Sequence, residues 1–180
     1  MTKLTYVNAQ NKKAVRDFLV NYFTFDTIVG LAGPDINDYL EWCRSKGCDA
    51  FEVYENNTNV LLTQIKNIRN ASKLSIKLGD ILQADASRDN VLFDLDFCAS
   101  VRYLKEHIAK FKNNFIMTFS TRIGVQETIN TFFAARSETI VHTKDVDGPI
   151  KHTIFETDNG TYLFIRYFDT SAMCCFAKIA

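Results

Sequence analysis

One stretch near the start of the chain, from Thr27 to Asn57, constrains the fold more than any other part of the sequence. It begins with a short apolar run, Thr27 to Leu31, after which Ala32-Gly33 allows the backbone to turn tightly. Pro34 suits the first position of a helix, because the N–H that proline lacks has no partner there. Ala50 to Glu55 then has the composition of a second strand. The order of strand, turn, helix and strand is that of a parallel βαβ unit.

The helix between these strands has one apolar face and a marked end. Four apolar residues follow at positions i, i+3, i+4 and i+7, and Gly47 stands where a left-handed C-terminal cap belongs. The four apolar residues are Ile36, Tyr39, Leu40 and Cys43. The second strand delivers Glu55 to its carboxyl end, which is the edge where open α/β sheets bind ligands. Glu55 is therefore the first candidate site residue.

The rest of the chain continues this alternation until the helical period stops. The helical segments are 8–23, 61–68, 101–111 and 125–133, and the strand-like runs are 72–78, 91–97 and 115–119. The polar segment His142 to Gly148 is expected to be a loop. Two last strand-like runs, 151–157 and 161–168, flank Asp158-Asn159-Gly160, which is a strong hairpin signal.

Length and composition favour one domain, residues 1–180, with a substantial core. Hydrophobic residues make up 47% of the chain, which excludes disorder, and no apolar run approaches the length of a membrane span. The 21 basic and 21 acidic side chains cancel. The total charge therefore predicts no nonspecific attraction to nucleic acid, although it does not exclude a local basic patch.

The cysteines and histidines argue against disulfides, export and a metal site. The five cysteines are odd in number, form no Cys-x-x-Cys pair and follow no secretory signal, which favours a reduced, cytoplasmic chain. His107, His142 and His152 are far apart and have no second histidine or cysteine at metal-ligand spacing. We therefore expect no metal.

Further carboxylates are expected at the carboxyl edge. The third strand runs into Gly79-Asp80, which makes Asp80 the next candidate. Glu55 and Asp80 each have an ordinary alternative as a solvated loop acid or a turn residue. The fourth strand carries Asp94 and Asp96, which we expect to point to opposite faces, so that at most one is catalytic and the other is capped or paired. Asp96 lies nearer the strand's end and is the better candidate.

Alternating strand–helix units that end in an antiparallel hairpin resemble the class I S-adenosylmethionine-dependent methyltransferase family over nearly the whole chain. The segment Gly30-Leu31-Ala32-Gly33-Pro34 resembles the glycine-rich first loop of that family. The resemblance implies an α/β, Rossmann-like, doubly wound and mostly parallel sheet, closed by a C-terminal antiparallel hairpin. It also implies S-adenosylmethionine as cofactor, with Glu55 on the ribose hydroxyls and Asp80 near the adenine amino group. The implied cofactor-binding residues are Gly30, Ala32, Gly33, Glu55 and Asp80.

The resemblance also implies an acceptor site at the ends of the fourth and fifth strands. Asp96-Phe97-Cys98 lies where the catalytic loop would be, and Asp96 would orient or deprotonate the acceptor. Cys98 is a candidate nucleophile, although a free buried cysteine is usually a small hydrophobe. Ser120 and Arg122 end the fifth strand, and Arg122 would hold an anionic substrate group or be an ordinary surface arginine.

Two acids near the first crossover helix disfavour a dinucleotide. Asp35 and Asp38 would repel a pyrophosphate that sought the N–H groups of the first turn, whereas a sulfonium ligand without phosphate tolerates them. The alternative is that both acids simply stabilise the start of the helix.

The sequence therefore leads to three hypotheses. The first is an S-adenosylmethionine-dependent methyltransferase, with a nucleic-acid acceptor slightly preferred because of the basic residues Lys66, Arg69, Lys73 and Lys77. The second is a non-catalytic binding or assembly subunit of the same fold, and the third is another nucleoside-handling enzyme. Binding of S-adenosylmethionine separates the first hypothesis from the second.

Overall fold

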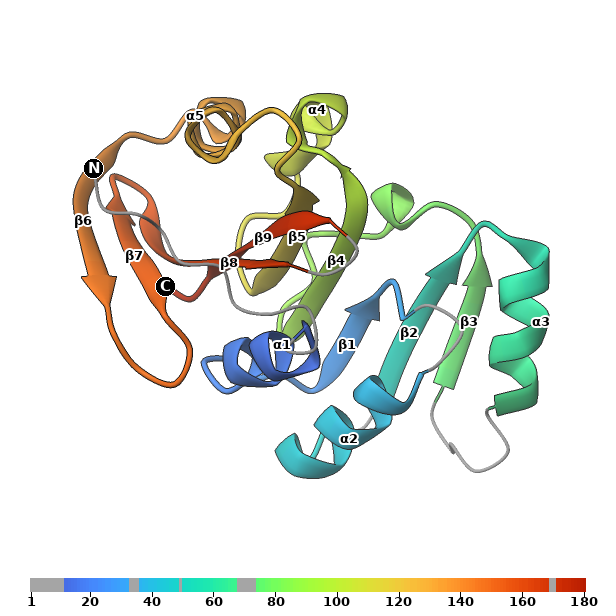
Figure 1. Cartoon of the computed structure of the whole chain (residues 1–180). Helices are drawn as coiled ribbons and strands as arrows, with labels where there is room; N and C mark the ends of the chain where they lie inside the picture. The colour runs from blue at the N-terminus through green and yellow to red at the C-terminus, as the bar shows by residue number, and fades with distance from the viewer. Residues whose placement is uncertain (1–11, 33–35, 49, 68–73, 169–170) are drawn as a thin grey trace.

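The computed structural model describes residues 12–32, 36–48, 50–67, 74–168 and 171–180, which build a nine-stranded sheet flanked by helices (Figure 1). The strands follow the order β3-β2-β1-β4-β5-β9-β8-β7-β6. The helices are α1 (Lys12–Val20), α2 (Asn37–Lys46), α3 (Thr58–Asn67), α4 (Lys105–Ile108) and α5 (Val125–Arg136). The strands are β1 (Thr27–Gly30), β2 (Ala50–Glu55), β3 (Leu74–Leu78), β4 (Val91–Ser100), β5 (Phe115–Ser120), β6 (Ile140–Val146), β7 (His152–Thr157), β8 (Gly160–Phe168) and β9 (Ala172–Lys178).

The first five strands form the parallel half of the sheet, as predicted. β1 pairs with β2 and β4, and the outer neighbours β3 and β5 run in the same direction. Gly30, the last residue of β1, is in register with Val53 of β2 and Asp94 of β4. All five strands therefore end at one edge, here called the carboxyl edge. β2 and β4 extend beyond β1 there.

The last four strands form the antiparallel half, which is larger than predicted. The expected hairpin is β7–β8, with Thr157 paired to Gly160, and this prediction is confirmed. β9 lies between β5 and β8 and is antiparallel to both. The loop predicted at 142–148 is wrong, because β6 spans Ile140–Val146. This edge strand is mostly exposed, so its polar residues carry no alternating pattern.

Alternate residues along each strand divide the core into two layers. Figure 1 shows α1 and α2 on one side of the sheet and α4 and α5 on the other. The layer under α1 and α2 contains Val15, Leu19, Ile28, Tyr39, Trp42, Leu92 and Ile116. The layer under α4 and α5 contains Phe93, Phe111, Phe115, Phe119, Phe132 and Phe176. Burial of this apolar area is the main source of stability for the fold.

The cap at the end of α2 is as predicted. Gly47 has φ of 66°, and its N–H bonds the carbonyl of Cys43. A left-handed residue there costs least when it is glycine. The described part of α2 begins at Asn37, and Pro34 lies outside the described residues.

Two other helix predictions are corrected. Residues 101–111 do not form one helix, because a short 3₁₀ helix at Val101–Tyr103 precedes the single turn of α4. In α3 the predicted apolar face is wrong, since Ile65 is 53% exposed and Gln64 is fully buried. Periodicity alone did not show that α3 covers only the edge of the sheet.

A disulfide joins Cys43 near the end of α2 to Cys48 before β2. The expectation that all cysteines are reduced is therefore wrong for this pair. The two residues flank the Gly47 turn, where sequence spacing does not reveal that their sulfurs meet. Among the described residues, no helix is long and apolar enough to cross a membrane.

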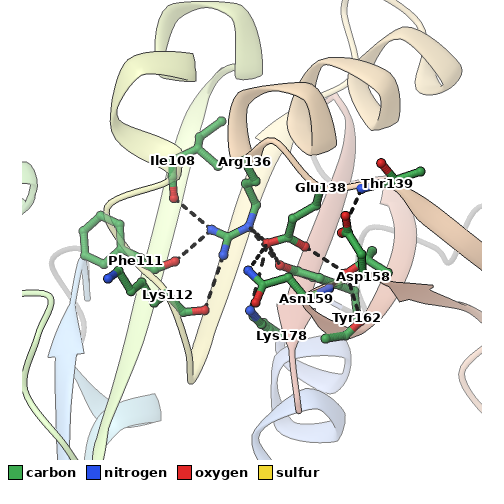
Figure 2. Close-up of polar contacts among 12 residues, drawn as sticks. Ile108, Phe111, Lys112, Arg136, Glu138, Thr139, Asp158, Asn159, Tyr162 and Lys178 are labelled. Carbon is green, nitrogen blue, oxygen red and sulfur yellow. Dashed lines mark hydrogen bonds and ion pairs between the residues drawn. The ribbon is translucent and has the colours of Figure 1, made fainter.

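A buried cluster at the amino end of β5, opposite to the carboxyl edge of the sheet, ties both halves of the sheet together (Figure 2). We call Arg136, Glu138 and Tyr162 the Arg136 cluster. The Arg136 guanidinium donates to the carbonyls of Ile108 and Phe111 at 3.0 and 2.8 Å, and to Glu138 at 2.9 Å. Tyr162 donates to Glu138 at 2.7 Å.

Hydrogen bonds satisfy the Glu138 carboxylate from several elements. Thr157 in β7 donates to it at 3.0 Å, and Asn159 in the hairpin turn donates at 3.3 Å. Burial alone would raise the pKa of Glu138, but Tyr162 and Arg136 outweigh this effect and hold the pKa below its usual value. The cluster thus fastens the end of α5 to the β7–β8 hairpin.

Candidate functional site

Glu55 and Asp80 lie at neighbouring strand ends on the carboxyl edge. The Gly79 N–H bonds the Glu55 carbonyl at 3.0 Å, which places Asp80 directly beside the end of β2. Each carboxylate also holds its own turn. Glu55 accepts the Asn57 N–H at 2.8 Å, and Asp80 accepts the Leu82 N–H at 2.9 Å. The structure therefore brings these two predicted residues together.

The first loop gives a specific reason for Gly30. A Cβ added there would lie 2.2 Å from the Tyr39 hydroxyl and 2.4 Å from the Asp94 carbonyl oxygen. Only glycine fits this close approach of α2 and β4 to the end of β1. Ala32 is partly buried against the core under α2, and Gly33 lies outside the described residues.

Beneath Gly30 lies a second buried cluster, which we call the Arg16 cluster: Arg16, Asp94 and Tyr39. The Arg16 guanidinium from α1 bonds the Asp94 carboxylate, and Tyr39 from α2 donates to the same carboxylate at 2.7 Å. Arg16 also lies 5.0 Å from the centre of the Trp42 ring. Asp94 and Tyr39 are fully buried. Three separate elements thus converge under the first loop.

Burial dominates the electrostatics of the Arg16 cluster. It raises the pKa of Asp94, and the nearby charge of Asp96 adds to the rise against the opposite effect of Arg16. Burial likewise raises the pKa of Tyr39, and the nearby charge of Asp94 adds to this rise. The tyrosine therefore stays protonated and acts as a hydrogen-bond donor.

The expectation that Asp94 and Asp96 face opposite sides is wrong. Residues two apart in a strand share a face, and both carboxylates lie under α1. Asp94 pairs with Arg16, as expected for one member of the two. Asp96 forms an ion pair with Lys12 at 2.7 Å, and its Oδ1 atom is buried without a hydrogen-bond partner among the described residues.

The fourth and fifth strands meet irregularly beyond Asp96. Asp96 pairs with Thr118, but the register then shifts until Ser100 pairs with Ser120, so Cys98 lies in the irregular stretch. Ser120 is buried, and its Oγ atom has no hydrogen-bond partner among the described residues. Arg122, directly after β5, is exposed. Asp96 and Ser120 therefore share one face near the edge, whereas Arg122 lies beyond it.

Two charged residues that the sequence analysis connected with ligand binding, Asp38 and Lys77, form ion pairs within the protein. Asp38 lies 3.6 Å from Arg16, so it is bound into the first-loop support, while Asp35 lies outside the described residues. Lys77 pairs with Glu52 at 2.9 Å. Sequence reasoning missed the roles of Arg16 and Tyr39. Asp94 in a central strand indicated that a buried carboxylate needs partners, but it did not indicate which residues they are.

The described residues contain no group of three histidine, cysteine, aspartate or glutamate side chains that could hold a metal ion. A scan against protein-family models and a search of curated proteins each found no match to the chain. The fold itself, however, has clear structural counterparts.

Three of the similar solved structures are methyltransferases. An S-adenosylmethionine-dependent O-methyltransferase from Thermotoga maritima aligns with a TM-score of 0.54 and 11% identity, over 98% of this chain and 68% of its own. A precorrin-6y C5,15-methyltransferase from Geobacter metallireducens GS-15 aligns with a TM-score of 0.54 and 13% identity, over 99% and 93%.

The third is a tRNA methyltransferase from B. subtilis, with a TM-score of 0.54 and 7% identity, over 90% of this chain and 64% of its own. These identities are low, so the likeness lies in the arrangement of strands and helices. The chain has the Rossmann-like fold of the class I S-adenosylmethionine-dependent methyltransferases.

Proposed function

We propose that the protein is an S-adenosylmethionine-dependent methyltransferase, with the donor over the ends of β1, β2 and β3 and the acceptor near the ends of β4 and β5. The observation that carries this proposal is the pair Glu55 and Asp80 at neighbouring strand ends of this fold. Open α/β sheets bind ligands at this edge. Carboxylates there can accept hydrogen bonds from ribose hydroxyls and from an adenine amino group.

The residues at this edge fit the donor chemically. A carboxylate offers about four lone-pair sites. Glu55 uses one for the Asn57 N–H, and Asp80 uses one for the Leu82 N–H. Further acceptor capacity therefore remains on both side chains. Gly30, Ala32 and Gly33 are proposed to form the loop that carries the donor, supported from below by the Arg16 cluster.

When bound, S-adenosylmethionine would supply an electrophilic methyl group. Methylation forms a bond from the acceptor to the methyl carbon, breaks the carbon–sulfur bond with its electron pair left on sulfur, and releases the acceptor's proton. We assign Asp96 to orient the acceptor and take that proton, with Ser120 beside it. Cys98 and Arg122 are proposed to line the outer part of the acceptor site. Alignment of the two reactants can supply most of the rate.

The class of acceptor is less constrained than the donor. The similar structures are named for acceptors as different as a precorrin and a tRNA. The basic residues that favoured nucleic acid support it weakly, since Lys77 pairs with Glu52, and Arg69 and Lys73 lie outside the described residues. Nucleic acid remains the acceptor we would test first.

Calorimetric titration with S-adenosylmethionine and S-adenosylhomocysteine tests the donor proposal. We expect saturable heat with both ligands, and methyl transfer to an RNA, DNA or small-molecule pool. Heat without transfer to any pool would favour the non-catalytic subunit. Binding of adenosine without binding of either ligand would favour another nucleoside-handling enzyme. No heat with any of the three would contradict the donor proposal.

A further inference from the structure

The surface built by residues 98–124 is basic, in a chain whose total charge is zero. This segment carries five basic residues and one acidic residue, Glu106, whereas the whole chain has 21 of each sign. The five basic residues are all exposed, and we call them, together with Tyr103, the basic surface. They are Arg102, Lys105, Lys110, Lys112 and Arg122. Such a group of cations creates a local positive potential that the total charge of the chain conceals.

Few acids of the protein neutralise these cations. Glu127 in α5 forms an ion pair with Arg102, and both side chains are exposed. The other four cations form no ion pair with a residue that the structure describes, and they are Lys105, Lys110, Lys112 and Arg122. Glu106, in α4 itself, is the only acid of the segment and is exposed. The basic surface therefore keeps an excess of positive charge that an anionic partner can use.

One end of the basic surface lies at the proposed acceptor site. The last residues of β4 and β5, Ser100 and Ser120, pair with each other. Tyr103 follows the first of them by three residues, and Arg122 follows the second by two. The ion pair between Arg102 and the first turn of α5 holds the chain after β4 beside the loop after β5. Tyr103 and Arg122 therefore both lie just beyond the carboxyl ends of β4 and β5.

The other end of the basic surface lies beside the chain that follows β3. The Lys110 ammonium donates to the Leu82 carbonyl, in the short 3₁₀ helix after β3. Lys110 and Lys112 also line an open hollow of about 450 Å³, which residues 83–87 bound on the other side. Asp85 lines this hollow too, but its carboxylate is bonded within its own turn at 2.6 and 3.0 Å. The hollow thus has room for a nucleotide-sized group next to two ammonium groups.

Tyr103 adds an aromatic ring to this charged surface. Its side chain is 83% exposed, the largest exposed fraction among the large apolar side chains that the structure describes. Its neighbour Val101 is fully buried, which anchors the short helix that carries the ring. An exposed ring among cations is the arrangement with which proteins bind single-stranded nucleic acid, since a base stacks on the ring while phosphates contact the cations. A membrane surface fits less well, because it needs several apolar side chains and Tyr103 is the only large one exposed among the described residues of 98–124.

We propose that the basic surface binds a single-stranded nucleic acid, with one base stacked on Tyr103 and the phosphates on the cations, and delivers the target nucleotide to the ends of β4 and β5. The delivery rests on the proposed methyltransferase function, whereas the binding does not. A single strand is the favoured form because only an unpaired base leaves its face free for stacking. Lys110 and Lys112 would hold the strand away from the acceptor site, and Arg122 would hold it next to that site.

The first test measures the stacking on Tyr103 by fluorescence anisotropy. The probes are labelled oligouridylate and oligodeoxythymidylate of about 12 nucleotides, within the usual site size. Tyr103→Ala should weaken binding about tenfold, which is within the range for one stacked base, and Tyr103→Phe should keep the parental affinity. The control is Tyr22→Ala, which removes a ring that is 44% exposed outside this surface. Equal effects of Tyr103→Ala and Tyr22→Ala in folded variants would overturn the proposal.

The second test measures the phosphate contacts by repeating the titrations at several salt concentrations. Lys105→Gln and Arg122→Gln should each lower the slope of log K against log salt by about 0.7, the value for one phosphate contact in a single strand. The control is Lys144→Gln, because Lys144 is exposed in β6 and does not belong to the basic surface. Its slope should match that of the parent. Parental slopes for Lys105→Gln and Arg122→Gln would overturn the proposal.

The outcomes separate this inference from the donor proposal. If S-adenosylhomocysteine fails to bind but either oligonucleotide binds with the expected dependence on Tyr103, the basic surface stands and the donor proposal fails. If S-adenosylhomocysteine binds and neither oligonucleotide does, the inference about the basic surface is overturned. A duplex bound as tightly as the single strand would overturn it as well, and so would binding to phosphatidylserine vesicles alone. The tighter of the two oligonucleotides identifies the strand as RNA or DNA.

Discussion

Two buried clusters of arginine, carboxylate and tyrosine can be compared: the Arg16 cluster near the carboxyl edge of the sheet, and the Arg136 cluster near the amino end of β5. In the Arg136 cluster, Arg136 donates to backbone carbonyls as well as to Glu138, and several side chains satisfy the carboxylate. In the Arg16 cluster, the Arg16 Nε atom and the Asp94 Oδ1 atom are buried without hydrogen-bond partners among the described residues. The same three residue types are thus satisfied at one edge and incompletely satisfied at the other.

This difference separates two uses of buried charge. A fully bonded cluster rigidifies the parts that it joins, and here it fastens the end of α5 to the β7–β8 hairpin (Figure 2). The Arg16 cluster lies under Gly30, and Asp96, two residues after Asp94 on the same strand, has one buried carboxylate oxygen without a hydrogen-bond partner among the described residues. Unsatisfied or perturbed buried groups are frequent where a protein binds ligands, so the incomplete cluster supports the proposal that the carboxyl edge is the functional one.

The largest expected effect is on the Arg136 cluster. Arg136→Met leaves the buried Glu138 with only Lys178, 4.0 Å away, as a charge partner, and we expect the free energy of unfolding to fall by about 3–5 kcal/mol. Urea denaturation measures this. The control is Arg102→Met, because Arg102 and its partner Glu127 are both exposed and such pairs contribute about 0–1 kcal/mol. Equal effects for the two variants would show that the Arg136 cluster is not a structural fastening.

The next effect concerns the support of the first loop. Gly30→Ala places a Cβ against Tyr39 and Asp94, and overpacking of this kind costs about 1–3 kcal/mol of stability. Adding Tyr39→Phe should recover part of this loss, since it removes one of the two contacting oxygens. Gly79→Ala is the matched control, because a Cβ at that position meets nothing within 4 Å. A Gly30→Ala variant as stable as Gly79→Ala would contradict the geometry.

A smaller effect is expected on donor binding. Glu55→Ala should weaken S-adenosylhomocysteine at least tenfold, or about 1.4 kcal/mol, because it removes a carboxylate proposed to bind the ribose hydroxyls. Calorimetry measures the change. The control is Glu52→Gln on the same strand, because Glu52 pairs with Lys77 and does not lie at the strand's end. The affinity of the Glu52→Gln variant for S-adenosylhomocysteine should match that of the parent. Parental affinity in a folded Glu55→Ala variant defeats the ribose assignment.

The smallest effect is a pH dependence. Because the folded pKa of Glu138 is lowered, its contribution to stability is present above its unfolded pKa of about 4.5 and is lost as the pH falls through the folded pKa. The difference in unfolding free energy between parent and Glu138→Gln should therefore shrink on acidification. Urea denaturation from about pH 7 to about pH 3 measures it. A difference that grows toward low pH would mean that the folded pKa is raised.

Much of the parallel half was predictable because its signals are local. β2 has the predicted bounds, Gly47 caps α2 as expected, and Glu55 lies at the predicted strand end. Each of these features depends on residues within a few positions of one another.

The parts that were missed depend on distant partners. Arg16 and Asp94 are 78 residues apart, and nothing near either residue predicts their pairing. β9 was missed because its central residues form a continuous apolar run without strand alternation.

Hydrogen exchange of the parent with and without S-adenosylhomocysteine tests the central claim most directly, because it reports both clusters in one measurement. We predict ligand-dependent protection of the backbone amides at Gly30 to Ala32, Glu55 to Asn57 and Gly79 to Leu82. The amides of Arg136 to Glu138 should exchange equally slowly in both states. Protection confined to residues around the Arg136 cluster, or no change anywhere at saturating ligand, would contradict the assignment of the carboxyl edge as the functional site.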